Sequence, residues 1–187
     1  SLHFSGVGRM SKPFISVVIP VYNEEYTLDL CLDALVKQDY SGEVEIVVVD
    51  NNSTDRSARI ARSYGCRVVF EPNRGYVHAL RTGFAAAQGT IIACTDGDSI
   101  VGPNWLSQIQ RILSKPGVVA CSGAFVFFDG AEWVRLLGKI FGRCNYHLAG
   151  ANMAVHKWAY DAVGGLSEAI NLGADVELGM RLKRMGK

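Results

Sequence analysis

The chain has 187 residues, of which 49% are hydrophobic and 20% charged, a composition typical of one globular domain with a single core. Its formal net charge of +1 at pH 7 gives no general attraction to nucleic acid, so we exclude nucleic acid as a partner. The five cysteines are scattered without the CxxC spacing of a zinc site, which favours reduced thiols and a cytoplasmic protein.

The first half of the chain alternates between short apolar runs and amphipathic stretches. Residues 1–11 lack this pattern, and we expect them to be a tag remnant outside the domain. Runs rich in β-branched residues predict buried strands. These runs are residues 14–19, 44–49, 66–70 and 90–95. Apolar stripes, N-caps and closing glycines predict the intervening helices. These helices cover residues 28–35, 54–64 and 75–88.

The second half continues the alternation less regularly. Pro103 suits the first turn of a helix, and residues 118–128 form a further predicted strand. A last helix begins near Asp175. Because the sequence stops at Lys187 directly after this helical pattern, we expect the domain to fill residues 12–187 and the natural protein to continue. No apolar run of about 18 residues occurs, so we expect no membrane-spanning segment in this sequence.

The repeated β-α units predict a mostly parallel sheet with helices on both faces, the Rossmann-like α/β class. Ligands of such sheets bind beyond the C-terminal ends of the strands. Three of the predicted strands end in polar clusters, at residues 20–24, 50–55 and 96–98. We therefore expect these clusters to meet at one edge of the sheet and to form a binding site there.

The acidic turn at residues 96–98 is the sharpest of these signals. Asp96 and Asp98 stand one residue apart after a buried strand, so both carboxylates can share one hard divalent cation. Mg²⁺ or Mn²⁺ would complete its shell with phosphate oxygens and would neutralise a departing diphosphate. The alternative is a solvated acidic turn without a ligand.

The clusters after the first two strands are ambiguous. Asp50 can accept the imide N–H of uracil or a ribose hydroxyl, or it can cap the following turn. Glu24 can bind a ligand or stabilise a helix N-terminus. Neither a GxGxxG nor a Walker A sequence occurs, so metal and side chains must hold any phosphates. Arg81 is a candidate phosphate donor, and an exposed helix arginine is its alternative.

A series of short motifs, in this order, resembles the signatures of family 2 glycosyltransferases with the GT-A fold. They are SVVIPVYNE (16–24), VDNNSTD (49–55), NRG (73–75), RTG (81–83), DGD (96–98), GANMA (150–154), VGGL (163–166), DVEL (175–178) and RL (181–182). The resemblance covers nearly the whole chain. It implies an inverting hexosyltransferase that moves a sugar from a nucleoside diphosphate sugar to an acceptor hydroxyl. A UDP-sugar is favoured over a GDP-sugar, and the acceptor would be a saccharide or a lipid-linked molecule.

The resemblance also implies roles for individual residues. It assigns nucleotide-sugar binding to Pro20, Tyr22, Glu24, Asp50, Arg81, Asp96, Gly97, Gly150 and Asn152. The ligands of Mn²⁺ or Mg²⁺ would be Asp98 and Asp96. Asp175 matches the family's catalytic base, although Ala174 stands where the family usually has a glutamate. Independently of the resemblance, a carboxylate on the first turn of a helix can take a proton from a hydroxyl, or it can simply favour the helix dipole.

Two other functions fit parts of the pattern. A sugar nucleotidyltransferase also combines an α/β domain, a metal and a nucleotide sugar. It would need a basic, glycine-rich loop after the first strand, where residues 21–25 are bulky and acidic. A non-catalytic binding module would keep the pocket but would have no need of Asp175.

Residues 131–143 form a basic amphipathic stretch that includes Trp133 and Phe141. Packing of its apolar side on the sheet is the favoured interpretation. The alternative is a peripheral contact with a membrane interface, which would place a cytoplasmic enzyme at the inner face of the membrane and would suit a lipid-linked acceptor.

Overall fold

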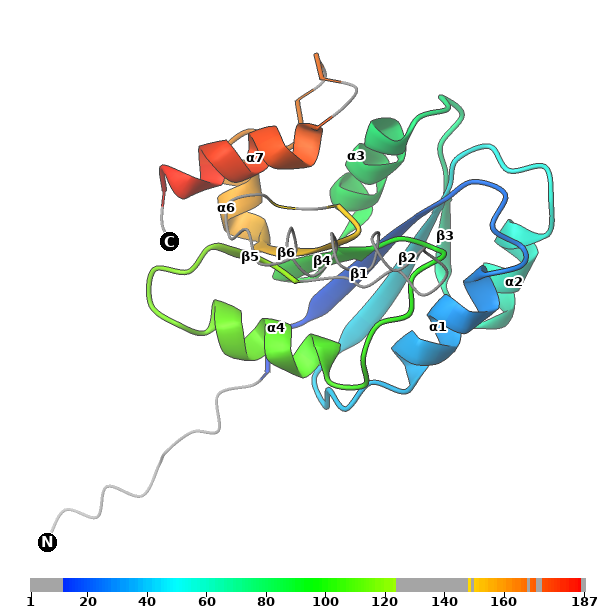
Figure 1. Ribbon diagram of the computed structural model, residues 1–187, viewed down its shortest axis with the longest axis horizontal. Helices are drawn as coiled ribbons and strands as arrows, with labels where there is room; N and C mark the ends of the chain where they lie inside the picture. Colours follow the sequence, from blue (N-terminus) through cyan, green and yellow to red (C-terminus); the bar gives the residue numbers. More distant parts are fainter. Residues whose placement is uncertain (1–11, 124–147, 149, 168, 171–172, 186–187) are drawn as a thin grey trace, which may run out of the picture.

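The computed structural model describes residues 12–123, 148, 150–167, 169–170 and 173–185, and Figure 1 shows their arrangement. Within these residues the strands form one six-stranded sheet with the order β3-β2-β1-β4-β6-β5. The strands are β1 (Ile15–Val21), β2 (Val44–Asp50), β3 (Arg67–Phe70), β4 (Ile91–Thr95), β5 (Ala120–Ser122) and β6 (Asn152–His156).

The central strands of the sheet are parallel. β1 pairs in parallel with both β2 and β4, and β3 pairs in parallel with β2. β6 runs antiparallel to β4, and β5 antiparallel to β6. The predicted class, an α/β domain with a mostly parallel sheet, is therefore confirmed. Because Val21 and Asp50 are register partners, β1 and β2 end side by side at one edge of the sheet.

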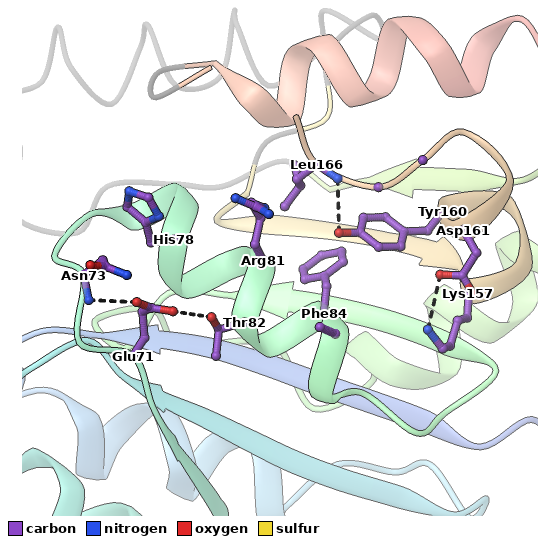
Figure 2. Close-up of a pocket in the computed structure, with 13 residues that line it drawn as sticks. Glu71, Asn73, His78, Arg81, Thr82, Phe84, Lys157, Tyr160, Asp161 and Leu166 are labelled. Atoms are coloured by element: carbon purple, nitrogen blue, oxygen red, sulfur yellow. Dashed lines mark hydrogen bonds and ion pairs between the residues drawn. The ribbon is translucent and has the colours of Figure 1, made fainter. Parts of the chain in front are cut away.

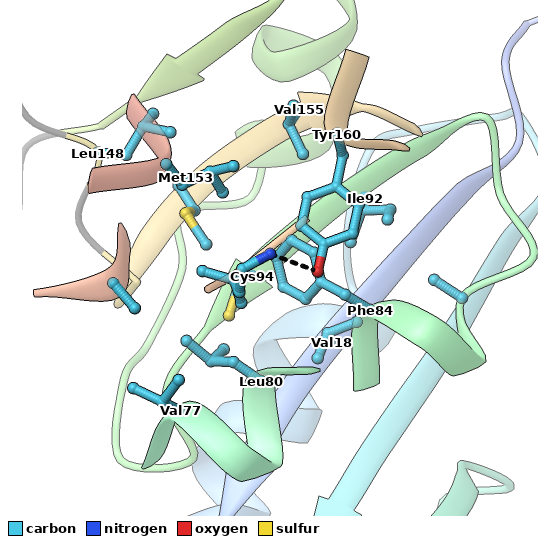
Figure 3. Close-up of a cluster of buried hydrophobic side chains, with 14 of the residues drawn as sticks. Val18, Val77, Leu80, Phe84, Ile92, Cys94, Leu148, Met153, Val155 and Tyr160 are labelled. Carbon is cyan, nitrogen blue, oxygen red and sulfur yellow. Dashed lines mark hydrogen bonds between the residues drawn. The ribbon is translucent and has the colours of Figure 1, made fainter. Parts of the chain in front are cut away.

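Helices cover both faces of this sheet, as expected (Figure 1). They are α1 (Leu28–Val36), α2 (Ser57–Ser63), α3 (Tyr76–Ala86), α4 (Trp105–Leu113), α6 (Lys157–Ala162) and α7 (Ala174–Lys183). Successive β1 residues point to opposite faces. Val17 and Ile19 pack in one core with α1, α2 and α4, whereas Val18 packs in a second core with α3, α6 and α7. Figure 3 shows this second core around Phe84, whose ring centroid lies 5.0 Å from that of Tyr160.

Three details differ from the sequence-based expectations. β1 continues through Pro20, whereas the proline was expected to end it. The pairing of β1 with β4 stops at Val18, so beyond that point β1 pairs with β2 alone, and a proline is tolerated at such a local edge. Neither β6 nor α6 is predicted from the sequence, because both are short and take their form from pairing with β4 and packing on α3.

Two expectations for the second half lie wholly or partly outside the described residues. They are the amphipathic segment 131–143 and the end of the strand predicted over 118–128, of which the structure describes β5. None of the helices in the described part of the chain is long and apolar enough to cross a membrane.

Helix α3 lies unusually close to the sheet. A Cβ atom at Gly83 would stand 2.3 Å from Val18 Cγ1 and 2.8 Å from Val49 Cγ2, both in strands of the parallel core. Only a glycine therefore lets the α3 backbone approach β1 and β2 to this distance. This close packing fixes where the N-terminus of α3 lies at the edge of the sheet.

We expect Gly83→Ala to lower the free energy of unfolding by about 1–3 kcal/mol, because the added methyl group overpacks the helix–sheet contact. The loss should occur although alanine favours a helix over glycine by about 1 kcal/mol. Urea unfolding measures the change. Gly179→Ala on α7 is the matched control, since its nearest neighbour would be the movable Leu148 side chain at 3.3 Å. A stability of Gly83→Ala equal to or above the wild-type value would contradict this account of the packing.

Candidate active site

A pocket of about 350 Å³ opens at the C-terminal ends of β1, β2 and β4. Its lining residues lie at or after the ends of four strands: β1 (Pro20, Val21, Tyr22, Glu24), β2 (Asn51), β3 (Arg74, Gly75, Tyr76, Ala79) and β4 (Asp96, Gly97, Asp98). The three polar clusters predicted to meet at one edge of the sheet do meet there. The predicted site residues that line this pocket come from the β1 and β4 clusters. They are Pro20, Tyr22, Glu24, Asp96, Gly97 and Asp98.

Asp96 is an acid of the pocket that is both partly buried and hydrogen-bonded. The Tyr76 hydroxyl donates a hydrogen bond of 2.9 Å to Asp96 Oδ1. Burial raises the pKa of the Asp96 carboxyl above its usual range, and this bond opposes the rise. The neighbouring carboxylates of Asp98, Glu24 and Asp175 raise the Asp96 pKa further. The pocket thus concentrates acidic side chains, with Glu24, Asp96 and Asp98 among its lining residues.

The donor set of this edge fits a hard divalent cation. Asp96 and Asp98 offer carboxylate oxygens on one turn, and the excess negative charge favours a cation there. Among the described residues no three acidic, histidine or cysteine side chains already converge as a metal cage. The two aspartates therefore fit a cation that keeps part of its shell for phosphate oxygens, as Mg²⁺ and similar ions do.

Gly97 allows the acidic turn to pack tightly. A Cβ atom at this position would lie 3.2 Å from Val21 Cγ2 and 3.4 Å from Glu24 Cγ. The turn after β4 therefore lies directly against the segment that follows β1. This contact holds Asp96 and Asp98 beside Glu24, which explains why the three acids share one pocket.

Asn51 holds the loop that leads into α3. Its side-chain amide donates to Asn73 O at 2.7 Å and to Glu71 O at 3.2 Å, and its Oδ1 accepts from Gly75 N at 2.8 Å. Its own backbone N–H donates to Val21 O at 2.8 Å. The residue is only 5% exposed, so these bonds satisfy a buried polar group. One amide thus joins the ends of β1 and β2 to the chain leaving β3.

Arg74, which the sequence analysis did not single out, is the cation among the lining residues of the pocket. Its guanidinium lies over the Tyr22 ring, 4.4 Å from the ring centroid. Such a cation–π contact brings the positive charge of Arg74 to the pocket wall formed by the β1 cluster. The sequence feature that could have identified Arg74 is the NRG motif at 73–75, which supports the family resemblance but assigns no role to its arginine.

Arg81 lies elsewhere. It lines a second cavity of about 540 Å³ between α3 and α6, with Glu71 and His78 on one side and Lys157 on the other (Figure 2). Arg81 follows Tyr76 by five positions, which turns its side chain about 140° around the helix. The two residues therefore leave different faces of α3. The structure places Arg74, and not Arg81, at the nucleotide-sized pocket.

Asp175 lies on the first turn of α7 and is held by backbone donors. Gly150 N donates to Asp175 Oδ2 at 2.8 Å, and Val176 N donates to Oδ1 at 2.9 Å. Because its charge contributes to the raised pKa of Asp96, the two carboxylates interact electrostatically. The structure thus brings Asp175 and Gly150 to the same site as the acidic turn, although they lie far along the chain.

Three residues predicted to bind the nucleotide sugar accept hydrogen bonds from other groups of the protein. Asp50 Oδ1 accepts from Ser53 N at 2.9 Å, the capping role that was its alternative. Glu24 Oε2 accepts from the Thr27 hydroxyl at 2.8 Å while the residue also lines the pocket. Asn152 Oδ1 accepts from Trp105 Nε1 at 2.8 Å, on the side of the sheet that α4 covers. Their roles in ligand binding stay predictions.

Comparison with known proteins points to one family. Residues 16–161 match the model of the family described as glycosyl transferase family 2. The glycosyltransferase AglE of Haloferax volcanii is 34% identical over 122 residues, which cover 62% of this chain and 40% of AglE. The glycosyltransferase EpsJ of Bacillus subtilis is 38% identical over 108 residues, which cover 55% of this chain and 30% of EpsJ.

A solved structure gives the same result for the fold. The mannosyltransferase PcManGT from Pyrobaculum calidifontis, in complex with GDP-Man and Mn²⁺, matches with a TM-score of 0.77 and 25% sequence identity. The match covers 95% of this chain and 54% of PcManGT. The chain thus spans less than half of AglE and EpsJ and about half of PcManGT.

We expect Asn51→Asp to lower the free energy of unfolding by about 2–3 kcal/mol, because a carboxylate would face the carbonyl oxygens of Glu71 and Asn73 without a donor between them. Urea unfolding measures the loss. Asn104→Asp is the matched control, since Asn104 is exposed and its side-chain oxygen accepts from Gln108. We expect the control to stay within about 0.5 kcal/mol of the wild type. Equal effects of the two substitutions would show that the Asn51 amide does not hold the loop.

Proposed function

The chain belongs to glycosyl transferase family 2, and from this premise we propose that it moves a sugar from a nucleoside diphosphate sugar to an acceptor hydroxyl with inversion at the anomeric carbon. The observation that carries the proposal is that Asp96 and Asp98 line one pocket and that Asp175 is joined to Asp96 through contacts of Tyr76 and Gly150. Membership in a family of glycosyltransferases supports sugar transfer over nucleotidyl transfer.

The pocket at this edge is proposed to bind the nucleotide part of the donor. Pro20 and Tyr22 would form the wall of the nucleoside site, next to the end of β2. The Asp50 carboxylate can accept the imide N–H of uracil, and the N1–H of guanine offers a similar donor. We favour a UDP-sugar, with a GDP-sugar as the alternative that the GDP-Man complex of PcManGT supports. Arg74 would contribute positive charge toward the diphosphate.

Asp96 and Asp98 are proposed to hold Mn²⁺ or Mg²⁺. The Mn²⁺ in the complex of PcManGT supports a divalent ion in this family, and the excess of acidic charge in the pocket supports its place here. When bound, such an ion supplies electrostatic stabilisation of the diphosphate that leaves the sugar. Tyr76 already directs one oxygen of Asp96 by its hydrogen bond.

Asp175 is proposed to be the general base. The acceptor oxygen forms a bond to the anomeric carbon as the bond from that carbon to the diphosphate breaks, and the proton of the acceptor hydroxyl passes to Asp175. The bond from Gly150 N orients the Asp175 carboxylate for this transfer. Gly150 would also leave room for the sugar, since it carries no side chain. Most of the rate enhancement would come from positioning and electrostatics.

The acceptor and the location of the reaction are proposed only by class. We propose a hydroxyl of a saccharide or of a lipid-linked molecule, and a reaction in the cytoplasm or at the inner face of a membrane. The segment that bears on a membrane contact, residues 131–143, lies outside the described residues.

Donor binding should be visible as thermal stabilisation. We expect one UDP-, GDP- or dTDP-sugar with MnCl₂ to raise the melting temperature, because a ligand that binds only the folded state stabilises it. Asp98→Asn should abolish the metal-dependent part of this shift. Asp39→Asn, at an exposed acid at the opposite end of the strands, is the control and should keep the full shift. If no donor with metal stabilised the wild type at millimolar concentration, the proposed function would be overturned.

Loss of the Asp175 carboxylate should reduce turnover much more than it weakens binding of the donor. We expect Asp175→Asn to lower kcat for release of nucleoside diphosphate by about a hundredfold or more, because a general base contributes about 10²–10⁴ in rate. The Kd of the donor should change little, since the amide oxygen can still accept from Gly150 N.

Glu177→Gln is the matched control, because Glu177 is another first-turn acid of α7 and forms an ion pair with Arg181. Its kcat should stay near the wild-type value. Equal losses of kcat in the two variants would mean that Asp175 only serves the helix. A wild-type protein that binds donor without any turnover would instead be a non-catalytic binding module.

A further inference from the structure

Tyr76 lies between the two acidic parts of the site. It is the first residue of α3, directly after the loop that Asn51 holds. Its hydroxyl donates to Asp96 Oδ1 at 2.9 Å. The residue is 44% exposed and lines the pocket with its neighbours at the start of α3. A side chain so exposed contributes little to the core, so the hydroxyl needs an explanation within the site.

Gly150 contacts the same hydroxyl from the other side. A Cβ atom at Gly150 would lie 2.4 Å from Tyr76 Oη and 3.0 Å from Tyr76 Cε1. A side chain at position 150 would therefore displace the hydroxyl end of Tyr76 or the Gly150 backbone. The N–H of Gly150 donates to Asp175 Oδ2 at 2.8 Å. A short chain of contacts thus runs from Asp96 through Tyr76 and Gly150 to Asp175.

We infer that Tyr76 is a positioning residue that sets the placement of the donor-side carboxylate Asp96 relative to the base Asp175. Its hydroxyl orients Asp96 directly, and its packing against Gly150 fixes the backbone N–H that orients Asp175. The inference rests on the proposed function, because the roles of Asp96 and Asp175 come from it. Tyr76 begins α3, Asp96 follows β4, Gly150 precedes β6 and Asp175 lies at the start of α7, so no local segment could make this arrangement alone.

The chemistry favours positioning over simple packing. The sheet edge places two carboxylates near each other, and their like charges repel. A hydrogen-bond donor to each carboxylate offsets part of this cost. A phenol can donate to Asp96 without adding charge, and a backbone amide does the same for Asp175. Phenylalanine would cover the same surface but would leave Asp96 Oδ1 without this donor.

The first test removes the hydroxyl and keeps the ring. We expect Tyr76→Phe to weaken the binding of UDP or GDP in the presence of MnCl₂ about tenfold, measured by calorimetry, since a hydrogen bond to a charged group is lost. For donor turnover, KM should rise about tenfold while kcat changes less than threefold, because Asp175 keeps its bond to Gly150. Tyr26→Phe is the matched control, because Tyr26 is 85% exposed, and its Kd and KM should equal the wild-type values.

The second test uses Gly150→Ala alone and combined with Tyr76→Phe. The single variant should lower kcat at least tenfold, since the methyl group would displace the Tyr76 hydroxyl or the N–H that holds Asp175. The double variant should regain at least threefold of that loss, because the atom nearest to the methyl group is gone. The same four proteins are unfolded in urea with EDTA, and Gly150→Ala should lower the midpoint less in the Tyr76→Phe background.

The outcomes distinguish failure of the positioning role of Tyr76 from failure of the proposed function. If the wild type binds a nucleotide but Tyr76→Phe binds it with the same Kd and KM, the positioning role is overturned and the proposed function stands. Equal effects of Gly150→Ala in both backgrounds also overturn the positioning role. If the wild type binds none of UDP, GDP and dTDP with MnCl₂, the proposed function fails. Additive urea midpoints would then overturn the coupling of Tyr76 to Gly150 as well.

Discussion

The hydrogen bonds of the Asn51 side chain are the interaction on which the site depends most. β1 and β2 end as register partners at Val21 and Asp50, and the next residue is Asn51. Its buried amide uses both donors and its oxygen to hold the backbone of residues 71–75. That loop carries Arg74 and delivers the chain to Tyr76 at the start of α3. The wall of the pocket opposite the acidic turn therefore rests on one amide.

The rigidity of the two cores makes such a loop useful. The sheet alternates its side chains between a core with α1, α2 and α4 and a core with α3, α6 and α7. Gly83 lets α3 approach the strands so closely that the helix has little freedom to shift. Loops that leave a buried parallel sheet can then present polar side chains at fixed positions, whereas loops without such support would not.

The electrostatics of the edge are unfavourable for the protein alone. Asp96 is partly buried beside Asp98 and Glu24, and burial, followed by the charges of the neighbouring carboxylates, raises the pKa of its carboxyl. A site that gathers like charges gives up some stability, which a cationic partner can restore. Tyr76 and the Gly150 N–H supply neutral donors to Asp96 and Asp175, so each acid is oriented without being neutralised.

The sequence by itself determined the α/β class, the central strands that end in polar clusters, and the edge of the sheet at which these clusters meet. These features follow from local periodicity and from the rule that parallel strands share the edge where their C-terminal ends lie. Only the tertiary structure decided which side chains face the pocket. The sequence singled out Arg81 and not Arg74, yet α3 turns Arg81 into the second cavity and Arg74 lines the pocket. The contacts of Asn51 with Gly75 and of Tyr76 with Asp96 and Gly150 were invisible because they join distant segments. Such contacts depend on how closely helices and loops pack on the sheet, and no local pattern of residues encodes that distance.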